Sequence, residues 1–387
     1  MMILMIYKTI PVSQSLCKDE PTNQTKSATN LLVRRISTTG LITVGEFKDP
    51  ESREVFRYLR SDHSLLGGIW IGPSMKSVQK KFSNLNQIQL EKIAIENSES
   101  IYSTFIIQEA IRLVKRNQTH SKKQEEEALI MEGNSGLGIG VSAKTLMKHS
   151  IKTTIVEIDP TVYKYAREYF GMIQPNGGIY LEDIRVYLNR NLANDESKDR
   201  QETVMDKFDY VIHDVFTGGM VPADLFVKSF WIDLKKVLKI DGVLVINFAG
   251  LPSSRAGLMV LLTIFDVFSF CRTFSEKDFR DQNPEELEFQ NLVFFCKMNE
   301  VPEFRPVTKS DVLNSNHKFW ILNRLMNHEL TEVMSSILLK HQDLKEEMVL
   351  KEPKDSIKLK LAQIPSALNH WNVMRELLDE KTWENYY

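Results

Sequence analysis

The sequence predicts an α/β protein built around a mostly parallel sheet that helices cover on both faces. Two observations carry this prediction. From residue 128 to about residue 298, short apolar runs alternate with stretches of helical pattern. The apolar runs, among them ALIMEG, TTIVEI and FDYVIHDVF, are almost continuously hydrophobic, which is typical of parallel strands that are buried on both faces.

Composition places the chain among globular proteins and excludes several other classes. Of the 387 residues, 42% are hydrophobic and 26% are charged, a mixture that collagen-like and wholly disordered chains lack. The 49 Lys and Arg nearly balance the 51 Asp and Glu, so no overall field favours nucleic acid or anionic lipid. No apolar run approaches the roughly 18 residues that a membrane-spanning helix needs. We therefore expect neither a nucleic acid nor a membrane as partner.

The three cysteines predict a reducing compartment. Cys17, Cys271 and Cys296 form no CxxC pair and have no short Cys/His spacing, which disfavours a disulfide framework and a metal site. Cys271 and Cys296 lie in apolar strand patterns, where we expect them as small buried hydrophobic side chains. The start, MMILMIYKTI, is short for a signal sequence. We expect a cytoplasmic protein, unless the true N-terminus lies upstream.

Shifts in composition divide the chain into four parts. Residues 1–30 are largely polar and are expected to be disordered. Residues 31–124 predict a small β-rich module that begins with a hairpin around the sequence TTG and ends in a helix over residues 101–114. Residues 125–300 hold the α/β domain. Residues 301–387 predict a helical extension without recognisable chemistry, whose charged run KEEMVLKEPKDSIKLK is expected on a solvated face.

A glycine-rich turn between the first strand of the α/β domain and the next helix is the strongest chemical signal. Gly136, Gly138 and Gly140 let the backbone turn tightly and approach a ligand, and the following helix offers unpaired N–H groups. The GxGxG pattern alone also fits an ordinary turn between strand and helix. Glu157, seventeen residues after Gly140 and at the end of the next strand, favours the functional interpretation. A carboxylate there can accept hydrogen bonds from both ribose hydroxyls of an adenosine cofactor.

Acidic residues also follow the next strands. Asp159 is expected to be the N-cap of a helix with Pro160 in its first turn. Asp183 follows the third strand, where it either accepts from an adenine amino group or caps the next segment. Asp214 ends the fourth strand and should face the reacting end of a cofactor, because ligands of open parallel sheets bind at the carboxyl ends of the strands. His213, one residue earlier, should point to the opposite face.

Together these motifs resemble the spermidine synthase-like branch of the class I S-adenosylmethionine-dependent methyltransferases. The resemblance covers residues 64–298 and depends on GLGIGVSA, VEIDP, the segment around Asp183, and the stretch from FDYVIHDVFTGG to DGVLVINFAG. It implies a seven-stranded, Rossmann-like methyltransferase sheet in three α/β/α layers with an antiparallel last strand, and S-adenosyl-L-methionine as cofactor. The cofactor-binding residues are then expected to be Gly136, Gly138, Gly140, Glu157, Asp159, Asp183 and Asp214.

The resemblance leaves three functions open. True spermidine synthases carry two aspartates three residues apart after strand four, and the second binds and deprotonates the attacking amine. Here Asp214 matches the first, but Thr217 stands in the place of the second, and a hydroxyl cannot take a proton from an amine at neutral pH. We therefore predict methyl transfer by in-line displacement, with Asp214 and Thr217 as catalytic residues. Aminopropyl transfer and a catalytically silent scaffold are the alternatives.

The methyl acceptor is not encoded in these motifs, and we expect either a protein or a small molecule. Asn247 at the end of the fifth strand, Tyr102 and Gln108 are weaker candidates for the site. Glu109 would replace the missing base only if the fold brings it there. Spermidine synthase relatives commonly dimerise, which favours a homodimer.

Overall fold

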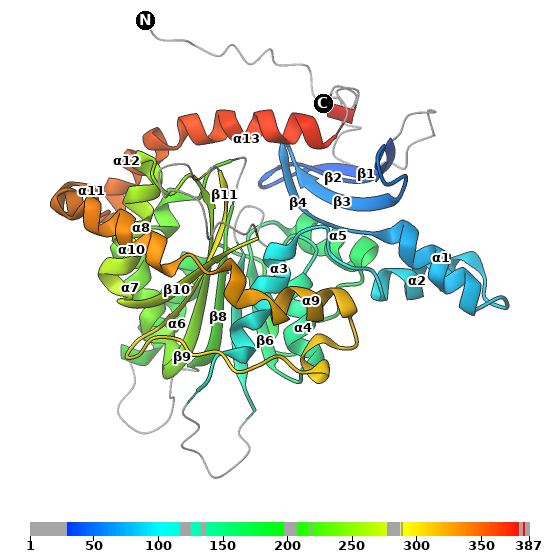
Figure 1. Cartoon of the computed structure of the whole chain (residues 1–387), viewed down its shortest axis with the longest axis horizontal. Coiled ribbons are helices and arrows are strands. Elements are labelled where there is room, and N and C mark those ends of the chain that lie inside the picture. Colours follow the sequence, from blue (N-terminus) through cyan, green and yellow to red (C-terminus); the bar gives the residue numbers. More distant parts are fainter. Residues whose placement is uncertain are drawn as a thin grey trace, which may run out of the picture.

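A seven-stranded sheet forms the centre of the protein, whose computed structural model is shown in Figure 1. Its strands are β5 (Glu127–Glu132), β6 (Lys152–Glu157), β7 (Gly178–Tyr180), β8 (Phe208–Asp214), β9 (Leu238–Gly250), β10 (Phe270–Ser275) and β11 (Gln290–Lys297). They lie in the order β10-β11-β9-β8-β5-β6-β7, and only β11 runs antiparallel to its neighbours. The structure describes residues 29–116, 125–132, 137–196, 207–216, 219–276, 287, 289–378 and 382–383.

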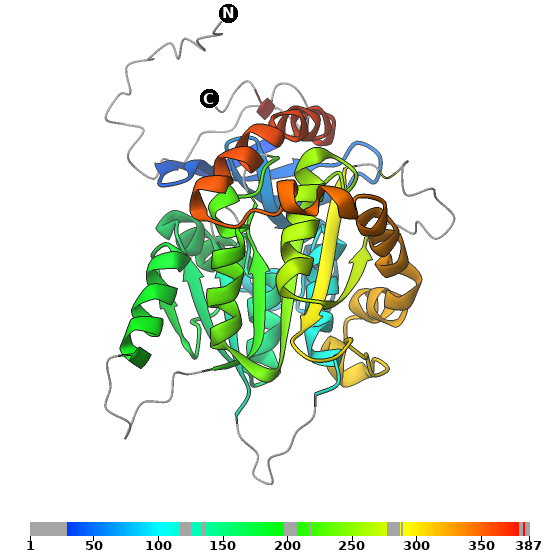
Figure 2. The same cartoon turned by 90° about the vertical axis from the view of Figure 1, so that its left-hand side faces the viewer.

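Helices cover both faces of this sheet (Figure 2), and alternate residues of one strand belong to different hydrophobic clusters. Ala128 and Ile130 of β5 point to one face, and Leu129 and Met131 to the other. The first face packs against α3 (Ser103–Gln108), α4 (Val141–Lys148), α5 (Pro160–Phe170) and α9 (Asn316–Asn323). The second packs against α6 (Ile184–Glu196), α7 (Lys228–Val237), α8 (Arg255–Val267), α10 (Thr331–Lys340) and α12 (Ser356–Ala362). The predicted three-layer α/β/α fold with an antiparallel last strand is confirmed.

A four-stranded antiparallel sheet precedes the central one. Its strands are β1 (Thr29–Ser37), β2 (Gly40–Lys48), β3 (Val55–Ser61) and β4 (Ser64–Ile69), and two helices follow, α1 (Ile71–Lys81) and α2 (Gln87–Glu96). The predicted hairpin is β1–β2. The expected helix over residues 101–114 is shorter, because α3 gives way to a 3-10 turn over Glu109–Leu113. The disorder expected for residues 1–30 concerns residues outside the described part, apart from the start of β1, and the predicted domain boundaries stay predictions.

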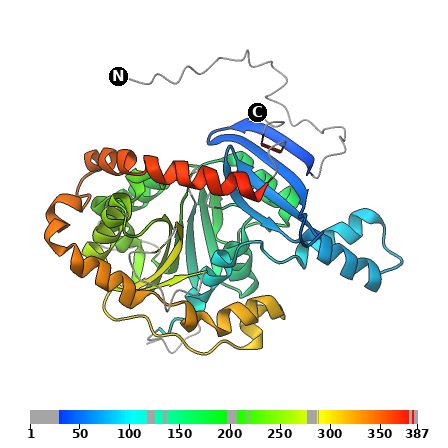
Figure 3. The ribbon, with the colours of Figure 1, turned by 45° about the horizontal axis from the view of Figure 1, so that its top comes forward.

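The C-terminal extension packs onto the rest of the fold through apolar residues, while most charged residues of the run KEEMVLKEPKDSIKLK are exposed, as expected. Met348, Val349 and Leu350 are buried, and the Leu350 N–H donates to Thr263 Oγ1 of α8 at 2.9 Å. These three apolar residues in the middle of the run therefore hold it against α8, while the charges around them remain in solvent. Helix α13 (Ile364–Leu377) then crosses above the end of the central sheet toward the N-terminal module (Figure 3).

Cys271 and Cys296 form a disulfide, which corrects the prediction of two unpaired thiols. Both residues are buried as expected, but the β10–β11 pairing sets them directly opposite each other, with their Cα atoms 4.1 Å apart. The sequence did not indicate this disulfide because the bond depends on the register in which β10 and β11 pair. The expected reducing compartment loses the support that it drew from unpaired cysteines.

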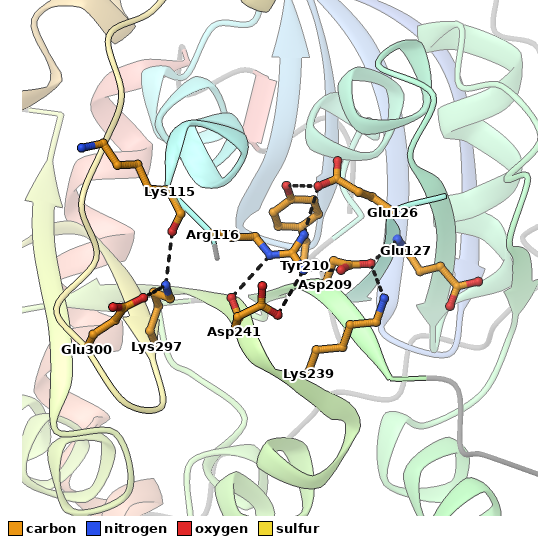
Figure 4. A network of polar contacts seen from close by, with 10 residues as sticks. All are labelled: Lys115, Arg116, Glu126, Glu127, Asp209, Tyr210, Lys239, Asp241, Lys297 and Glu300. Carbon is orange, nitrogen blue, oxygen red and sulfur yellow. Dashed lines mark hydrogen bonds and ion pairs between the residues drawn. The ribbon is translucent and has the colours of Figure 1, made fainter. Parts of the chain in front are cut away.

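A polar network ties the amino ends of the central strands together (Figure 4). Arg116 donates to the carboxylates of Glu126, Asp209 and Asp241, and Lys239 donates to Asp209 at 2.8 Å. The acids compensate a guanidinium that is almost fully buried, as a buried charge requires.

None of the described helices combines the length and apolar character that crossing a membrane needs.

Alkylation of the unfolded protein tests the disulfide. Without reductant, only Cys17 should react, whereas reduction should make all three cysteines reactive, as read by mass spectrometry. Reduction should also lower the free energy of unfolding by about 3–4 kcal/mol, because the bond closes a loop across a sequence separation of 25 residues. Substituting Ser at both positions should reproduce that loss. Three reactive thiols in the unreduced protein would contradict the pairing.

Candidate active site

Buried acids gather at the carboxyl edge of the central sheet. Glu157 ends β6, Asp214 ends β8 and Asn247 lies opposite Asp214 on β9. Asp159 caps α5 two residues beyond Glu157. All four side chains are buried. Because the parallel strands β6, β5, β8 and β9 are neighbours, their ends place these groups along one edge, where ligands of such sheets bind.

The glycine turn after β5 leads into α4 beside these acids. Gly138 and Gly140 have φ angles of +48° and +73°, in the left-handed region that favours glycine. A Cβ on Gly140 would lie 2.4 Å from Met172 Sδ, so a larger residue would have to displace that side chain in addition to adopting a strained backbone. Gly136 lies outside the described residues. The two described glycines thus form a tight turn at the start of α4, as predicted.

Glu157 faces this turn with few hydrogen-bond donors. Its Oε1 accepts from the Asp159 N–H at 2.7 Å, and its Oε2 accepts from the Leu137 N–H at 3.3 Å. Burial raises the pKa of Glu157 to about 8, although these backbone hydrogen bonds oppose the shift. The carboxyl group therefore sits at the position predicted for it and has little solvation of its own.

Asp159 faces the N-terminal hairpin. Its Oδ1 accepts from Ser37 Oγ at 2.6 Å and from the Thr161 N–H at 2.8 Å, and its Oδ2 accepts from Thr39 N–H and Oγ1 at 2.9 and 2.7 Å. The predicted N-cap is confirmed. A direct contact with a cofactor would have to displace one of these donors, so that part of the prediction is left as a proposal.

Asp214 is the centre of a buried hydrogen-bond network. Its Oδ2 accepts from Gln108 Nε2 at 2.6 Å and its Oδ1 from Asn247 Nδ2 at 2.9 Å. Gln108 Oε1 in turn accepts from Ser142 Oγ, in the first turn of α4, at 2.9 Å. Burial raises the pKa of Asp214 against these two hydrogen bonds. Asn247 Oδ1 is buried and has no partner within the described part of the chain.

Two other polar residues are turned away from this edge. His213 lies on the opposite face, as predicted, with its ring 4.6 Å from that of Trp231, and burial lowers its pKa to about 3. Glu109 is fully buried, and its Oε1 accepts from Lys318 Nζ at 2.6 Å and from Thr145 Oγ1 at 2.8 Å. Glu109 therefore does not replace the missing base.

The other predicted site residues that the structure describes make no hydrogen bond or ion pair with Glu157 or Asp214. Asp183 caps α6 by accepting from the Arg185 N–H at 2.8 Å, and it pairs with the Arg185 guanidinium at 2.6 Å, which lowers its pKa against the effect of burial. Tyr102 packs edge-on against Phe105. Thr217 lies outside the described residues. The contact of Gln108 with Asp214 is the one that the sequence indicated most weakly, since only family analogy pointed to it.

A cavity of about 610 Å³ lies at the other end of the strands, beside the network of Arg116. Its cationic side chains are already paired, Arg305 with Asp311 at 2.6 Å and Lys115 with Glu303 at 3.1 Å. In the described part of the chain, no group of three or more His, Cys, Asp or Glu side chains is arranged to hold a metal ion. The carboxyl edge is therefore the candidate site.

Comparison with known proteins finds similarity to spermidine synthases and to a methyltransferase. Residues 104–249 match the family model of the spermine/spermidine synthase domain. An N-terminal histidine N-methyltransferase of Emericella nidulans is 34% identical over 360 residues, which cover 92% of this chain and 58% of that protein. The chain thus spans little more than half the length of that relative. The resemblance to the spermidine synthase-like branch of the class I S-adenosylmethionine-dependent methyltransferases is confirmed.

Two further proteins are similar to parts of this chain. A polyamine aminopropyltransferase of Vibrio vulnificus is 35% identical over 95 residues, which cover 24% of this chain and 28% of that protein. A solved structure of a probable spermidine synthase from Corynebacterium glutamicum has 14% identity and a TM-score of 0.47, covering 74% of this chain and 85% of that one.

The pH dependence of stability tests the burial of Glu157. Its folded pKa of about 8 exceeds the ordinary value of 4.5, so the folded state holds the proton more tightly and loses stability as pH rises from about 4.5 to 8. Glu157→Gln should remove this loss and raise the free energy of unfolding at pH 8 by about 1–3 kcal/mol. Urea unfolding at pH 5 and pH 8 measures this free energy, and Glu332→Gln, at an exposed position, is the control. If the free energy of unfolding depended on pH equally in wild type and in Glu157→Gln, the burial of this side chain would be contradicted.

Proposed function

We propose that this chain is an S-adenosylmethionine-dependent methyltransferase whose acceptor is a nitrogen of an N-terminal histidine in a protein. The observation that carries the activity is the buried set of acceptors, Glu157, Asp214 and Asn247, at the carboxyl edge of the sheet. The family match supports the donor class. The name of the Emericella nidulans relative supports the acceptor.

The residues at this edge fit the proposed donor. S-adenosylmethionine offers two ribose hydroxyls and positively charged sulfonium and ammonium groups, whereas the edge offers carboxyl oxygens and an unpaired amide oxygen. Glu157 would accept from the ribose hydroxyls beside the turn formed by Gly138 and Gly140. Asp214 would face the methyl group that is transferred. When bound, the donor supplies an electrophilic methyl group on sulfur.

Asp214 would orient the acceptor nitrogen and take its proton. In-line displacement requires a nitrogen lone pair that faces the methyl carbon, and the electrons of the broken carbon–sulfur bond stay on sulfur. The proton that the nitrogen loses can pass to Asp214, because burial raises the pKa of this carboxyl group toward the range of a useful base. Gln108 and Asn247 bind both Asp214 oxygens and so fix the orientation of the group.

Aminopropyl transfer is the alternative that the family model and the Vibrio vulnificus relative favour. It needs a second acid to deprotonate the attacking amine, and Thr217 stands in that place. Glu109, the other acid nearby in sequence, is bound to Lys318. These residues favour methyl transfer over polyamine synthesis.

Mass spectrometry of reaction products tests the function. The protein, S-adenosylmethionine and a peptide that begins with histidine should yield a singly methylated peptide, and fragmentation should place the methyl group on the first residue. A peptide identical except for alanine at its start is the control. Spermidine formation from putrescine and decarboxylated S-adenosylmethionine would contradict the proposal in favour of the alternative, and failure to bind S-adenosylhomocysteine would indicate a silent scaffold.

Asp214→Asn should separate catalysis from binding. The amide keeps the size of the side chain but cannot take a proton, so we expect turnover to fall by about 10²-fold or more while donor affinity changes little. Partly exposed Asp233→Asn on α7, away from the carboxyl edge, is the matched control. Rates come from methyl incorporation and affinities from calorimetry. Unchanged turnover in Asp214→Asn would remove this residue from the mechanism.

Glu157→Gln, unlike Asp214→Asn, should weaken binding of the donor. Two ribose hydroxyls that donate to Glu157 favour its ionised form, whose hydrogen bonds are worth about 1.5–3 kcal/mol each. We therefore expect the affinity for S-adenosylhomocysteine to fall about tenfold or more, measured by calorimetry on the folded variant. Wild-type affinity in Glu157→Gln would show that the donor binds elsewhere.

A further inference from the structure

Helix α13 is fastened to the loop that follows Asp214. The buried Gln363 side chain accepts from the Val221 N–H at 2.6 Å and donates to the Val221 carbonyl oxygen at 3.1 Å. Gly219 has a φ angle of +85°, and a Cβ there would lie 2.6 Å from His370 Cβ. The backbone of the loop therefore packs directly on α13, without side chains between them.

The other end of the C-terminal segment is anchored on the N-terminal module. The ring of Trp371 lies 4.4 Å from that of His63 in the turn between β3 and β4, and Arg60 lies 4.9 Å above the ring of Trp383. Met374 and Leu378 are buried in the hydrophobic cluster of the same module. Because both ends are fixed, α13 spans the carboxyl edge of the sheet between the two modules (Figure 3).

His370 is the polar residue that α13 buries above this edge. It is 5% exposed, and its ring lies 5.1 Å from Phe216, two residues beyond Asp214, and 5.9 Å from Phe289, just before β11. Its Nδ1 is buried and has no hydrogen-bond partner among the described residues. Burial, and secondarily the charge of His63, lowers the pKa of His370 to about 4. A neutral imidazole thus lies near two aromatic rings, with one ring nitrogen that no described residue pairs.

We propose that α13 forms the wall of the acceptor pocket and that His370 is the residue that determines specificity for the first side chain of the acceptor. This inference rests on the proposed function, since it assigns recognition of the same acceptor. A buried polar atom without a partner is costly, and a ligand that pairs with it removes that cost. A neutral imidazole can exchange one hydrogen bond with the imidazole of the acceptor, and flanking aromatic rings suit a flat side chain.

The position of α13 also restricts the kind of acceptor. Because the helix is fixed at both ends across the edge, we expect a flexible chain end to reach Asp214 more easily than a folded surface. The assignment gives a role to the C-terminal extension, which lies outside the residues 104–249 that match the family model.

Binding of unmethylated peptides in the presence of S-adenosylhomocysteine tests this inference without turnover. Wild type should bind the peptide that begins with histidine at least tenfold more tightly than the same peptide with alanine first. His370→Phe keeps an aromatic ring and removes the hydrogen bond, so this preference should fall to about threefold or less while S-adenosylhomocysteine binding is retained. Exposed His317→Phe on α9 is the matched control and should behave as wild type.

Each outcome separates the inference from the function on which it rests. Failure of wild type to bind S-adenosylhomocysteine contradicts the proposed methyltransferase, whereas an unchanged peptide preference in His370→Phe contradicts only the role of His370. If His370→Phe does not fold, hydrogen exchange of wild type decides, because peptide binding should protect the amides of residues 364–377. Peptide binding without such protection, or no peptide binding at all, would overturn the assignment of α13.

Discussion

Three carboxyl groups are buried at one edge of the sheet, where water cannot solvate them, and much of the fold around this edge consists of the donors that they require. Asp159 binds the turn of the N-terminal hairpin, and Asp214 binds one residue before β5 and one on β9. The N-terminal module is therefore attached to the α/β domain through the same row of acids that forms the candidate site. Hydrogen bonds to buried acids both stabilise the assembly and shape the site.

The acids differ in how completely protein donors satisfy them, and this difference separates structural from functional groups. Asp159 has donors on both oxygens from four residues, which suits a group that holds two modules together. Among the described residues, Glu157 accepts only backbone hydrogen bonds, one of them long at 3.3 Å, and Asn247 Oδ1 and His370 Nδ1 have no partner. The incompletely paired atoms lie on the side where a donor and an acceptor would bind, so a ligand can supply the missing hydrogen bonds.

Local patterns in the sequence predicted what depends on neighbouring residues. The alternation of a strand predicted that His213 lies opposite Asp214, and capping chemistry predicted the start of α5 at Asp159 and Pro160. Contacts between distant segments were not predictable in this way. The Cys271–Cys296 bond depends on strand register, and the burial of Leu350 depends on where α8 lies. Sequence periodicity carries no information on either.

The account depends on the claim that the carboxyl edge between β6 and β9 binds an adenosyl donor. A crystal structure of the complex with S-adenosylhomocysteine tests this claim most directly. The account predicts both ribose hydroxyls within hydrogen-bond distance of Glu157, the adenosine beside the Gly138–Gly140 turn, and the sulfur directed toward Asp214 below α13. A ligand bound away from this edge, or one at this edge with its ribose turned away from Glu157, would contradict it.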